Sequence, residues 1–342
     1  MTKTRKICYG CLFALAAALL VLGVFFDKTI ADAMYQPENV MAKVMESVGI
    51  FPPFIFVSGL FAVLFFLIKE EDKNPLLKKV LCVIAVGLSY FVFGFMATEQ
   101  LLESKLVRAL IGLGTAVMLS PLTLLVFRSK SRDSLKRLSI FLIFASIVAL
   151  VSSLVSINVL KYIWGRPRYR EMMADGDYLL EAFTPWYQIN GISWHGHHSF
   201  PSGHTCSATN LLVLCALSEV FPEAEKRKTT IGFICGIYIF AMAYSRMVLG
   251  AHFLSDVAGG FFVGLLTYVV ARYVYFDKCR IVVDAIMQTN QSAAEEELAK
   301  PKWEEGERVE VELMPDDGAE EELTITEQVV DQTEENDSSK DS

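Results

Sequence analysis

The chain has 342 residues, of which 53% are hydrophobic and only 20% charged, and its mean hydropathy is +0.39. A soluble chain carries about 25% charged residues, so this composition excludes a disordered protein, a collagen, a disulfide-rich secreted scaffold and an ordinary cytosolic enzyme. The net charge of −8 comes from one end. Residues 277–342 hold 21 of the 39 acidic and only 6 of the 31 basic residues, which leaves a net charge of +7 on residues 1–276.

Long apolar segments fill most of the chain. A membrane-spanning helix needs about 20 mostly apolar residues, and eight segments meet this requirement: 8–26, 50–68, 79–98, 106–127, 138–160, 201–221, 229–249 and 253–275. The sequence therefore predicts an all-α, polytopic membrane helix bundle of about eight transmembrane helices. The first segment could also be a cleaved signal peptide, but its apolar stretch is longer than usual for one, which favours a retained span.

The basic residues of the loops predict the orientation in a cell membrane. They concentrate before the first span and in alternate loops, namely at 3–6, 69–79, 128–137 and 226–228. By the positive-inside rule both termini are then cytoplasmic. Loop 161–200 is predicted to face outward, yet it holds four basic residues against this bias: Lys161, Arg166, Arg168 and Arg170. The basic residues are dispersed in short loops, so no nucleic-acid binding is expected.

Three parts are predicted along the chain. Residues 1–100 hold N-terminal transmembrane helices, and residues 101–276 form a membrane core that contains the motifs described below. Residues 277–342 form an acidic cytoplasmic tail, predicted to be mostly disordered because it lacks the apolar content that would offset the entropy of ordering.

The first motif is a pair of cations in the predicted outer loop. Lys161 and Arg168 are seven residues apart, which places them on one face of a continuous helix, although Pro167 can break that helix. Two converging cations suit an anion with several oxygens, such as phosphate. The alternative is that both side chains extend to lipid head groups.

The second motif is Pro201-Ser202-Gly203-His204 at the start of the sixth span. Proline is favoured at the first position of a helix, so the amides of the next three residues would lack intrahelical partners and form an anion site. His204 at its rim could protonate a leaving group. A simple helix cap beside a surface histidine is the alternative.

The third motif contains Ser245-Arg246, then His252 and Asp256. The last two are spaced i, i+4, so they are predicted to share one helical face. A carboxylate there can hold one imidazole nitrogen and leave the other free for nucleophilic attack. Arg246 precedes a bend at Gly250 and can turn back to the same place. A chance His–Asp pair is the alternative for this motif alone.

Taken together, the three motifs resemble those of the type 2 phosphatidic acid phosphatase superfamily of membrane lipid phosphatases. The family pattern is Lys-x6-Arg-Pro, Pro-Ser-Gly-His and Ser-Arg-x5-His-x3-Asp. The resemblance covers about residues 138–275, and the second and third motifs match in full. The first departs after Arg168, where Tyr169 replaces the usual proline, and Arg166-Pro167 imitates the pair two residues early. Spacing assigns the phosphate contact to Arg168, with Arg166 as the alternative.

This resemblance implies a mechanism. His252 would attack phosphorus and form a phosphohistidine, Asp256 would orient its imidazole, and His204 would protonate the leaving oxygen and then activate water. The phosphoryl oxygens would be held by Lys161, Arg168, Ser202, Gly203 and Arg246. The family uses no metal or other cofactor, so none is expected here.

Two further features have less specific interpretations. His195, His197 and His198 could bind zinc with one more ligand, but no acidic or cysteine ligand lies near them in the sequence, and an incidental polar loop is favoured. Cys206 is interpreted as helix packing.

The function predicted from the sequence is hydrolysis of a lipid phosphate or polyprenyl pyrophosphate at the outer membrane face. Phosphatidic acid, phosphatidylglycerol phosphate and undecaprenyl pyrophosphate are the candidate substrates. A phosphotransferase with the same residues and a different acceptor is the alternative. A transporter is disfavoured, because transporters place ionisable residues in mid-membrane and the spans here have almost none. The sequence does not indicate an oligomeric state.

Overall fold

The computed structural model describes residues 3–99, 101–174, 183–192 and 198–279. The described residues form helices and loops without a strand, so the predicted all-α class is confirmed. The α-helices are α1 (Lys3–Met34), α2 (Val40–Val48), α3 (Pro52–Leu67), α4 (Pro75–Ala97), α5 (Lys105–Arg128), α6 (Arg132–Ala149), α7 (Ile157–Trp164), α8 (Tyr169–Ala174), α9 (Gly203–Thr209), α10 (Lys228–Val248) and α11 (Leu254–Arg272). The predicted tail beyond residue 279 lies outside the described residues.

Tighter and wider helical turns extend several of these helices. The π-helical turns η1 (Leu150–Ser156) and η5 (Tyr273–Lys278) join α6 to α7 and lengthen α11. The 3₁₀ helices η3 (Asn210–Glu219) and η4 (Pro222–Arg227) follow α9 and precede α10.

Seven of the described helical segments are long and apolar enough to cross a membrane. The eighth predicted span, 201–221, is shorter: it consists of the seven residues of α9 and the ten of η3. At a rise of 1.5 Å per α-helical and 2.0 Å per 3₁₀ residue, this segment is about 30 Å long. That matches the hydrocarbon thickness of a bilayer, because the 3₁₀ turns stretch the backbone.

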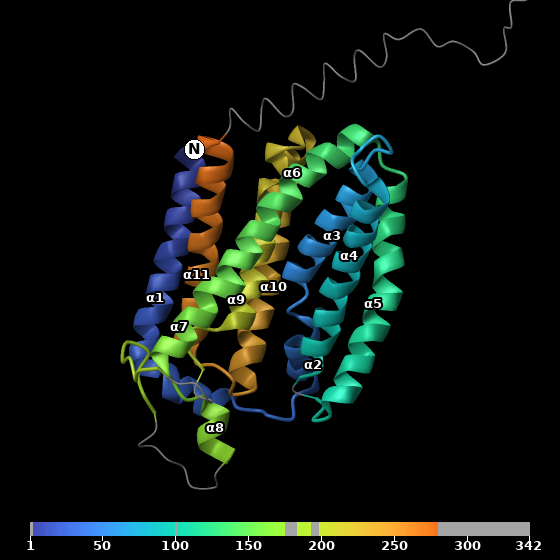
Figure 1. Ribbon diagram of the computed structural model, residues 1–342. Coiled ribbons are helices and arrows are strands. Elements are labelled where there is room, and N and C mark those ends of the chain that lie inside the picture. The colour runs from blue at the N-terminus through green and yellow to red at the C-terminus, as the bar shows by residue number, and fades with distance from the viewer. Residues whose placement is uncertain (1–2, 100, 175–182, 193–197, 280–342) are drawn as a thin grey trace, which may run out of the picture. The chain divides into compact units, whose positions relative to one another are not determined.

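The helices pack in two groups (Figure 1). In one group α1 lies along α11, and α9 packs between α10 and α11. In the other, α3, α4 and α5 pack against one another. Helix α6 crosses between the groups and contacts both α3 and α11. The largest buried apolar cluster lies where they meet and includes Phe144, Val213, Met242 and Leu265.

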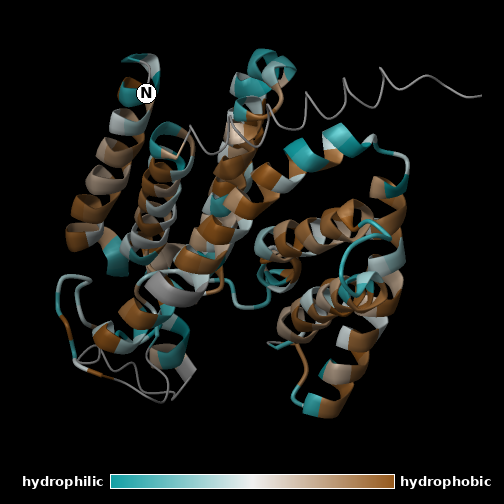
Figure 2. Ribbon diagram, turned by 45° about the horizontal axis from the view of Figure 1, so that its top comes forward, coloured by the Kyte–Doolittle hydropathy of each residue, from teal (hydrophilic) through white to brown (hydrophobic). Residues whose placement is uncertain are grey.

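The surface of the bundle suits a bilayer. Large apolar side chains are exposed on several helices, for example Phe25, Leu76, Met118 and Phe240. Figure 2 shows apolar residues along the helices and hydrophilic residues at helix ends and loops. The segments rich in basic residues gather at one end of the bundle. The N-terminus, the α3–α4 loop and the α5–α6 loop lie at this end, while α2 and α8 lie at the opposite end (Figure 1).

The segment between α1 and α3 is largely helical. Helix α1 continues to Met34, and Asn39 caps a further helix, α2, by accepting a hydrogen bond from Ala42 N (3.0 Å). Helix α2 packs against α10 and α4. It thereby contributes residues to the site that the sequence did not indicate.

Candidate active site

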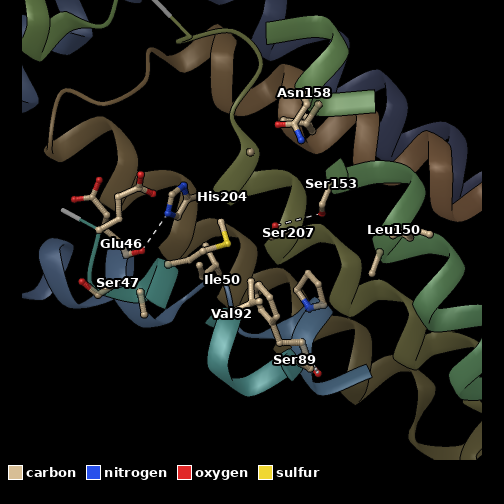
Figure 3. A pocket seen from close by; sticks show the side chains of 18 of the residues that line it. Glu46, Ser47, Ile50, Ser89, Val92, Leu150, Ser153, Asn158, His204 and Ser207 are labelled. Atoms are coloured by element: carbon tan, nitrogen blue, oxygen red, sulfur yellow. Dashed lines mark hydrogen bonds between the residues drawn. The ribbon is translucent and has the colours of Figure 1, made fainter. Parts of the chain in front are cut away.

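Six of the eight predicted site residues line one cavity of about 690 Å³: Lys161, Arg168, Gly203, His204, Arg246 and His252. Side chains of α3 and α4 form its apolar wall, among them Phe54, Val57, Leu88 and Val92, the last of which is labelled in Figure 3. The cavity follows η1 and α7 from Lys161 back to Leu150. A cationic region therefore continues into an apolar channel.

Ser202 supports this cavity from behind, because it is fully buried as the N-cap of α9. Its Oγ accepts a hydrogen bond from Thr205 N (3.3 Å), and its own amide donates to the carbonyl oxygen of Asp256 (2.9 Å). The helix thus begins at Gly203, two residues after the predicted start at Pro201. The Ser202 amide is engaged, which leaves the amides of Gly203 and His204 as those without intrahelical partners.

The start of α9 lies beside Lys161. A Cβ atom added to Gly203 would lie only 3.6 Å from Lys161 Nζ. The close fit of α9 depends on glycines of α11, since a Cβ on Gly260 would lie 2.2 Å from the carbonyl oxygen of Ser202. Small residues let helices approach closely in this way, and here they bring the Pro-Ser-Gly-His turn against the His252–Asp256 segment.

Arg246 lies near the end of α10 with only 2% of its side chain exposed. Its Nη2 donates to Glu46 Oε1 of α2 (2.7 Å), whereas Nε and Nη1 have no partner among the described residues. Unpaired buried donors are costly, so this guanidinium is equipped to hold further oxygens. Glu46 also accepts from Arg170 Nη1 (3.2 Å).

His204 contacts the same residue of α2. Its Nε2 lies 3.1 Å from the backbone carbonyl oxygen of Glu46 (Figure 3). A carbonyl oxygen only accepts hydrogen bonds, so Nε2 is the protonated ring nitrogen here. Glu46 therefore engages both Arg246 and His204.

His252 and Asp256 approach each other, but not on one helical face as predicted. Helix α11 begins at Leu254, so His252 precedes it, after a bend at Gly250 with φ of +61°. His252 Nδ1 lies 3.7 Å from Asp256 Oδ2, beyond hydrogen-bond distance. Oδ2 instead accepts from Phe253 N (2.8 Å) and Ser199 Oγ (2.5 Å). Asp256 is thus held as the cap of α11 and faces the imidazole.

The environment of His252 keeps its imidazole neutral. The side chain is 2% exposed. Burial, the largest influence, lowers the pKa of His252 to about 3, against the opposing effect of Asp256. A neutral imidazole has the free electron pair that nucleophilic attack requires.

Arg166, the alternative phosphate contact, does not line the cavity. Helix α7 ends at Trp164 and Gly165 has a φ of +54°, which turns the chain inward. Arg166 is fully buried and bonds to two carboxylates, Asp256 (2.5 Å) and Asp27 of α1 (2.9 Å). Arg168, to which the spacing assigns the phosphate contact, lines the cavity.

Sequence reasoning missed Asp27 and Glu46. Each is an acidic residue next to or within an apolar helix, 1% and 7% exposed respectively. An ionisable residue in a membrane segment is by itself a signal of function. Asp27 stands at the end of the first apolar run, so this signal was present in the sequence.

The remaining predictions concern the histidines at 195–198 and Cys206. His195 and His197 lie outside the described residues, while the ring of His198 packs edge-on against Tyr162 at 5.0 Å. In the described part of the chain, no three His, Cys, Asp or Glu residues are grouped as a metal site. Cys206 is fully buried in α9, consistent with packing.

Comparison with known proteins finds similarity over this part of the chain. A family model described as the PAP2 superfamily matches residues 140–280, which include all three motifs. Over 76 residues, 22% of this chain, the sequence is 37% identical to phosphatidylglycerophosphatase B of Bacillus subtilis (strain 168). The match spans 37% of that relative's length. No solved structure matches the chain significantly.

Proposed function

We propose that the chain, whose residues 140–280 match the PAP2 superfamily, is a membrane phosphatase that hydrolyses a lipid phosphate or pyrophosphate. The cavity carries the proposal. Its cationic region can hold a phosphoryl group, and its apolar channel along α3 and α4 can hold hydrocarbon. A molecule with phosphate at one end and an acyl or prenyl chain at the other complements both.

The proposed chemistry has two steps. Neutral His252 attacks phosphorus, the bond to the leaving oxygen breaks, and His204 donates a proton to that oxygen. In the second step His204 accepts a proton from water, the water oxygen bonds to phosphorus, and the phosphorus–nitrogen bond breaks to restore neutral His252. Asp256 faces the imidazole as positive charge develops on it, which is electrostatic stabilisation by a preorganised group.

The phosphoryl oxygens would be held by Lys161, Arg168 and Arg246, with the Gly203 amide at the start of α9, whereas Ser202, predicted as a further contact, is buried behind the cavity as the cap of that helix. Phosphoryl transfer depends mainly on positioning and charge stabilisation. Because these cations can supply that charge, we propose a reaction that needs no metal.

The proposed orientation places the site on the outer face and both termini in the cytoplasm. The basic loops that predict a cytoplasmic side lie at the end of the bundle opposite α2 and α8 (Figure 1). The name of the Bacillus relative suggests phosphatidylglycerol phosphate as the first substrate to test, beside phosphatidic acid and a polyprenyl pyrophosphate.

The test is phosphate release by the purified full chain in detergent with EDTA present. We expect release from at least one of the three lipids, inhibition by vanadate, and loss of activity in His252→Ala. Asp133→Asn is the matched control, because Asp133 pairs with Arg137 on α6 away from the cavity (2.9 Å). Absence of release by folded protein from all three lipids would contradict the proposal and favour a phosphotransferase that needs another acceptor.

A further inference from the structure

A buried chain of charges continues behind Asp256, on the side opposite His252. Arg166 lies at its centre with 0% of its side chain exposed. Its Nη1 donates to Asp256 Oδ1 (2.5 Å) and to Ser255 Oγ (2.8 Å), and its Nη2 donates to Asp27 Oδ2 (2.9 Å). Its Nε donates to the carbonyl oxygen of Thr184 (2.8 Å). All three nitrogens of the guanidinium are therefore engaged.

Asp27 is fixed as firmly as Arg166. Its Oδ1 accepts from the amide of Ser255, in the first turn of α11 (2.9 Å), and its Oδ2 accepts from the Ser255 hydroxyl. One turn earlier in α1, a Cβ on Gly23 would lie 2.6 Å from Ser255 Cβ. Gly23 thus lets α1 approach the start of α11 closely enough for the Asp27 carboxylate to reach it.

The charges of Asp27, Arg166 and Asp256 affect how strongly a positive charge on the His252 ring is stabilised. Asp256 and Arg166 alone form a neutral pair, which attracts a developing imidazolium weakly. Asp27 adds a second negative charge, so that Asp27, Arg166 and Asp256 together carry −1. In a buried site of low dielectric this difference of one charge is poorly screened. The bond to Arg166 also fixes Asp256 Oδ1, which leaves Oδ2 facing His252.

We propose that Asp27 is a positioning residue of the phosphatase site: through Arg166 it holds Asp256 in place and maintains the negative charge that stabilises His252 during phosphoryl transfer. This inference rests on the proposed function. It assigns to α1 a part in catalysis that no motif of the chain indicates. Asp27 reaches His252 through Arg166 and Asp256; residues that orient metal ligands from outside a site typically change activity about 10- to 100-fold when lost, and we expect the same range here.

The experiment compares Asp27→Asn, Arg166→Gln and the double variant in the full chain. The summed charge at positions 27, 166 and 256 is 0 in Asp27→Asn and −2 in Arg166→Gln. In the double variant it is −1, as in the wild-type chain. We expect each single variant to lower kcat about 10- to 100-fold with KM little changed. The double variant should lose less kcat than the two single losses multiplied together, because its net charge is restored even though Arg166 no longer holds Asp256.

Vanadate affinity separates this role from a merely structural one. We expect vanadate to be held by Lys161, Arg168 and Arg246, which the variants leave intact, so its affinity should stay near the wild-type value. Asp133→Asn is again the control. If an Asp27→Asn protein does not fold, the double variant carries the test alone, and a loss of kcat beyond about 1000-fold with vanadate affinity intact would overturn the inference.

Other outcomes are equally distinct. Wild-type kcat in both single variants, in an active phosphatase, would overturn the role of Asp27 while the proposed function stands. Additive losses in the double variant would show that the two residues act separately. An inactive wild-type protein would instead contradict the proposed function.

Discussion

Glu46 Oε1 lies 2.7 Å from Nη2 of Arg246, inside the cavity where a phosphoryl group is proposed to bind. The backbone carbonyl of Glu46 also lies 3.1 Å from His204 Nε2. One residue of α2 thus engages both the arginine proposed to hold phosphate and the histidine proposed to protonate the leaving oxygen. A bound phosphoryl group must share Arg246 with this carboxylate or displace it.

Neutralising Glu46 should therefore strengthen anion binding. We expect Glu46→Gln to bind vanadate about tenfold more tightly, because a negative charge a few ångströms from the anion is removed. Inhibition of phosphate release measures this. Glu38→Gln is the matched control, since Glu38 is exposed and pairs with Lys43 (2.7 Å). Weaker vanadate binding in Glu46→Gln would mean that Glu46 holds Arg246 in place for the phosphate.

The apolar wall of the cavity predicts a dependence on chain length. Val92 of α4 lies on this wall (Figure 3), and Val92→Trp should fill the channel. We expect KM for a long-chain lipid phosphate to rise about tenfold or more, with the rate on a short soluble phosphate ester little changed. The control is Leu76→Trp, because Leu76 is 75% exposed on α4. Equal effects on both substrates would contradict a hydrocarbon channel at this wall.

The buried imidazole predicts a specific titration. Because burial lowers the pKa of His252 to about 3, its ring should stay neutral as pH falls from 8 to 5, where an exposed histidine becomes protonated. Below pH 6.5 the His252 ring takes up a proton in the unfolded chain but not in the folded chain. The free energy of unfolding therefore decreases, through this residue, as pH falls from 6.5 towards 3. NMR of ring-labelled histidine, assigned with His252→Ala, measures it. A midpoint near 6.5 would contradict the neutral, buried nucleophile.

The close contact of α9 with α11 predicts that Gly260 tolerates no side chain. In Gly260→Ala the new Cβ would lie 2.2 Å from the Ser202 carbonyl oxygen, and overpacking of this kind costs about 1–3 kcal/mol. We expect a lower Tm and reduced activity. Gly236→Ala on α10 is the control, because its Cβ would meet no atom within 4 Å. An unchanged Tm in Gly260→Ala would contradict the tight fit.

The sequence predicted much of the fold because hydropathy alone determines which segments can cross a bilayer. The predicted span 229–249, for example, coincides closely with α10 at Lys228–Val248. Local details were less predictable. Pro201 was expected to start a helix, but Ser202 caps it, since the hydroxyl satisfies Thr205 N and the Ser202 amide bonds to Asp256. A contact with a residue of another helix cannot be read from local propensity.

The site was predictable where its residues lie in short motifs. Lys161, His204, Arg246 and His252 reach one cavity from three separated segments. Asp27 was missed although it ends an apolar run, and Glu46 carried no such signal; the bonds from Asp27 to Arg166 and from Glu46 to Arg246 each join residues more than 130 positions apart. Asp27 and Glu46 reach the site only because α1 packs against α11 and α2 packs against α10.

The most direct test of the account is detection of the covalent intermediate on His252. The protein would be incubated with a ³²P-labelled aryl phosphate, whose leaving group needs little protonation, and quenched. In His204→Asn, which lacks the group proposed to activate water, we predict an acid-labile, base-stable label on the peptide that contains His252. His252→Ala should carry none. A label on another residue, or an active protein that never accumulates label in His204→Asn, would contradict the phosphohistidine mechanism.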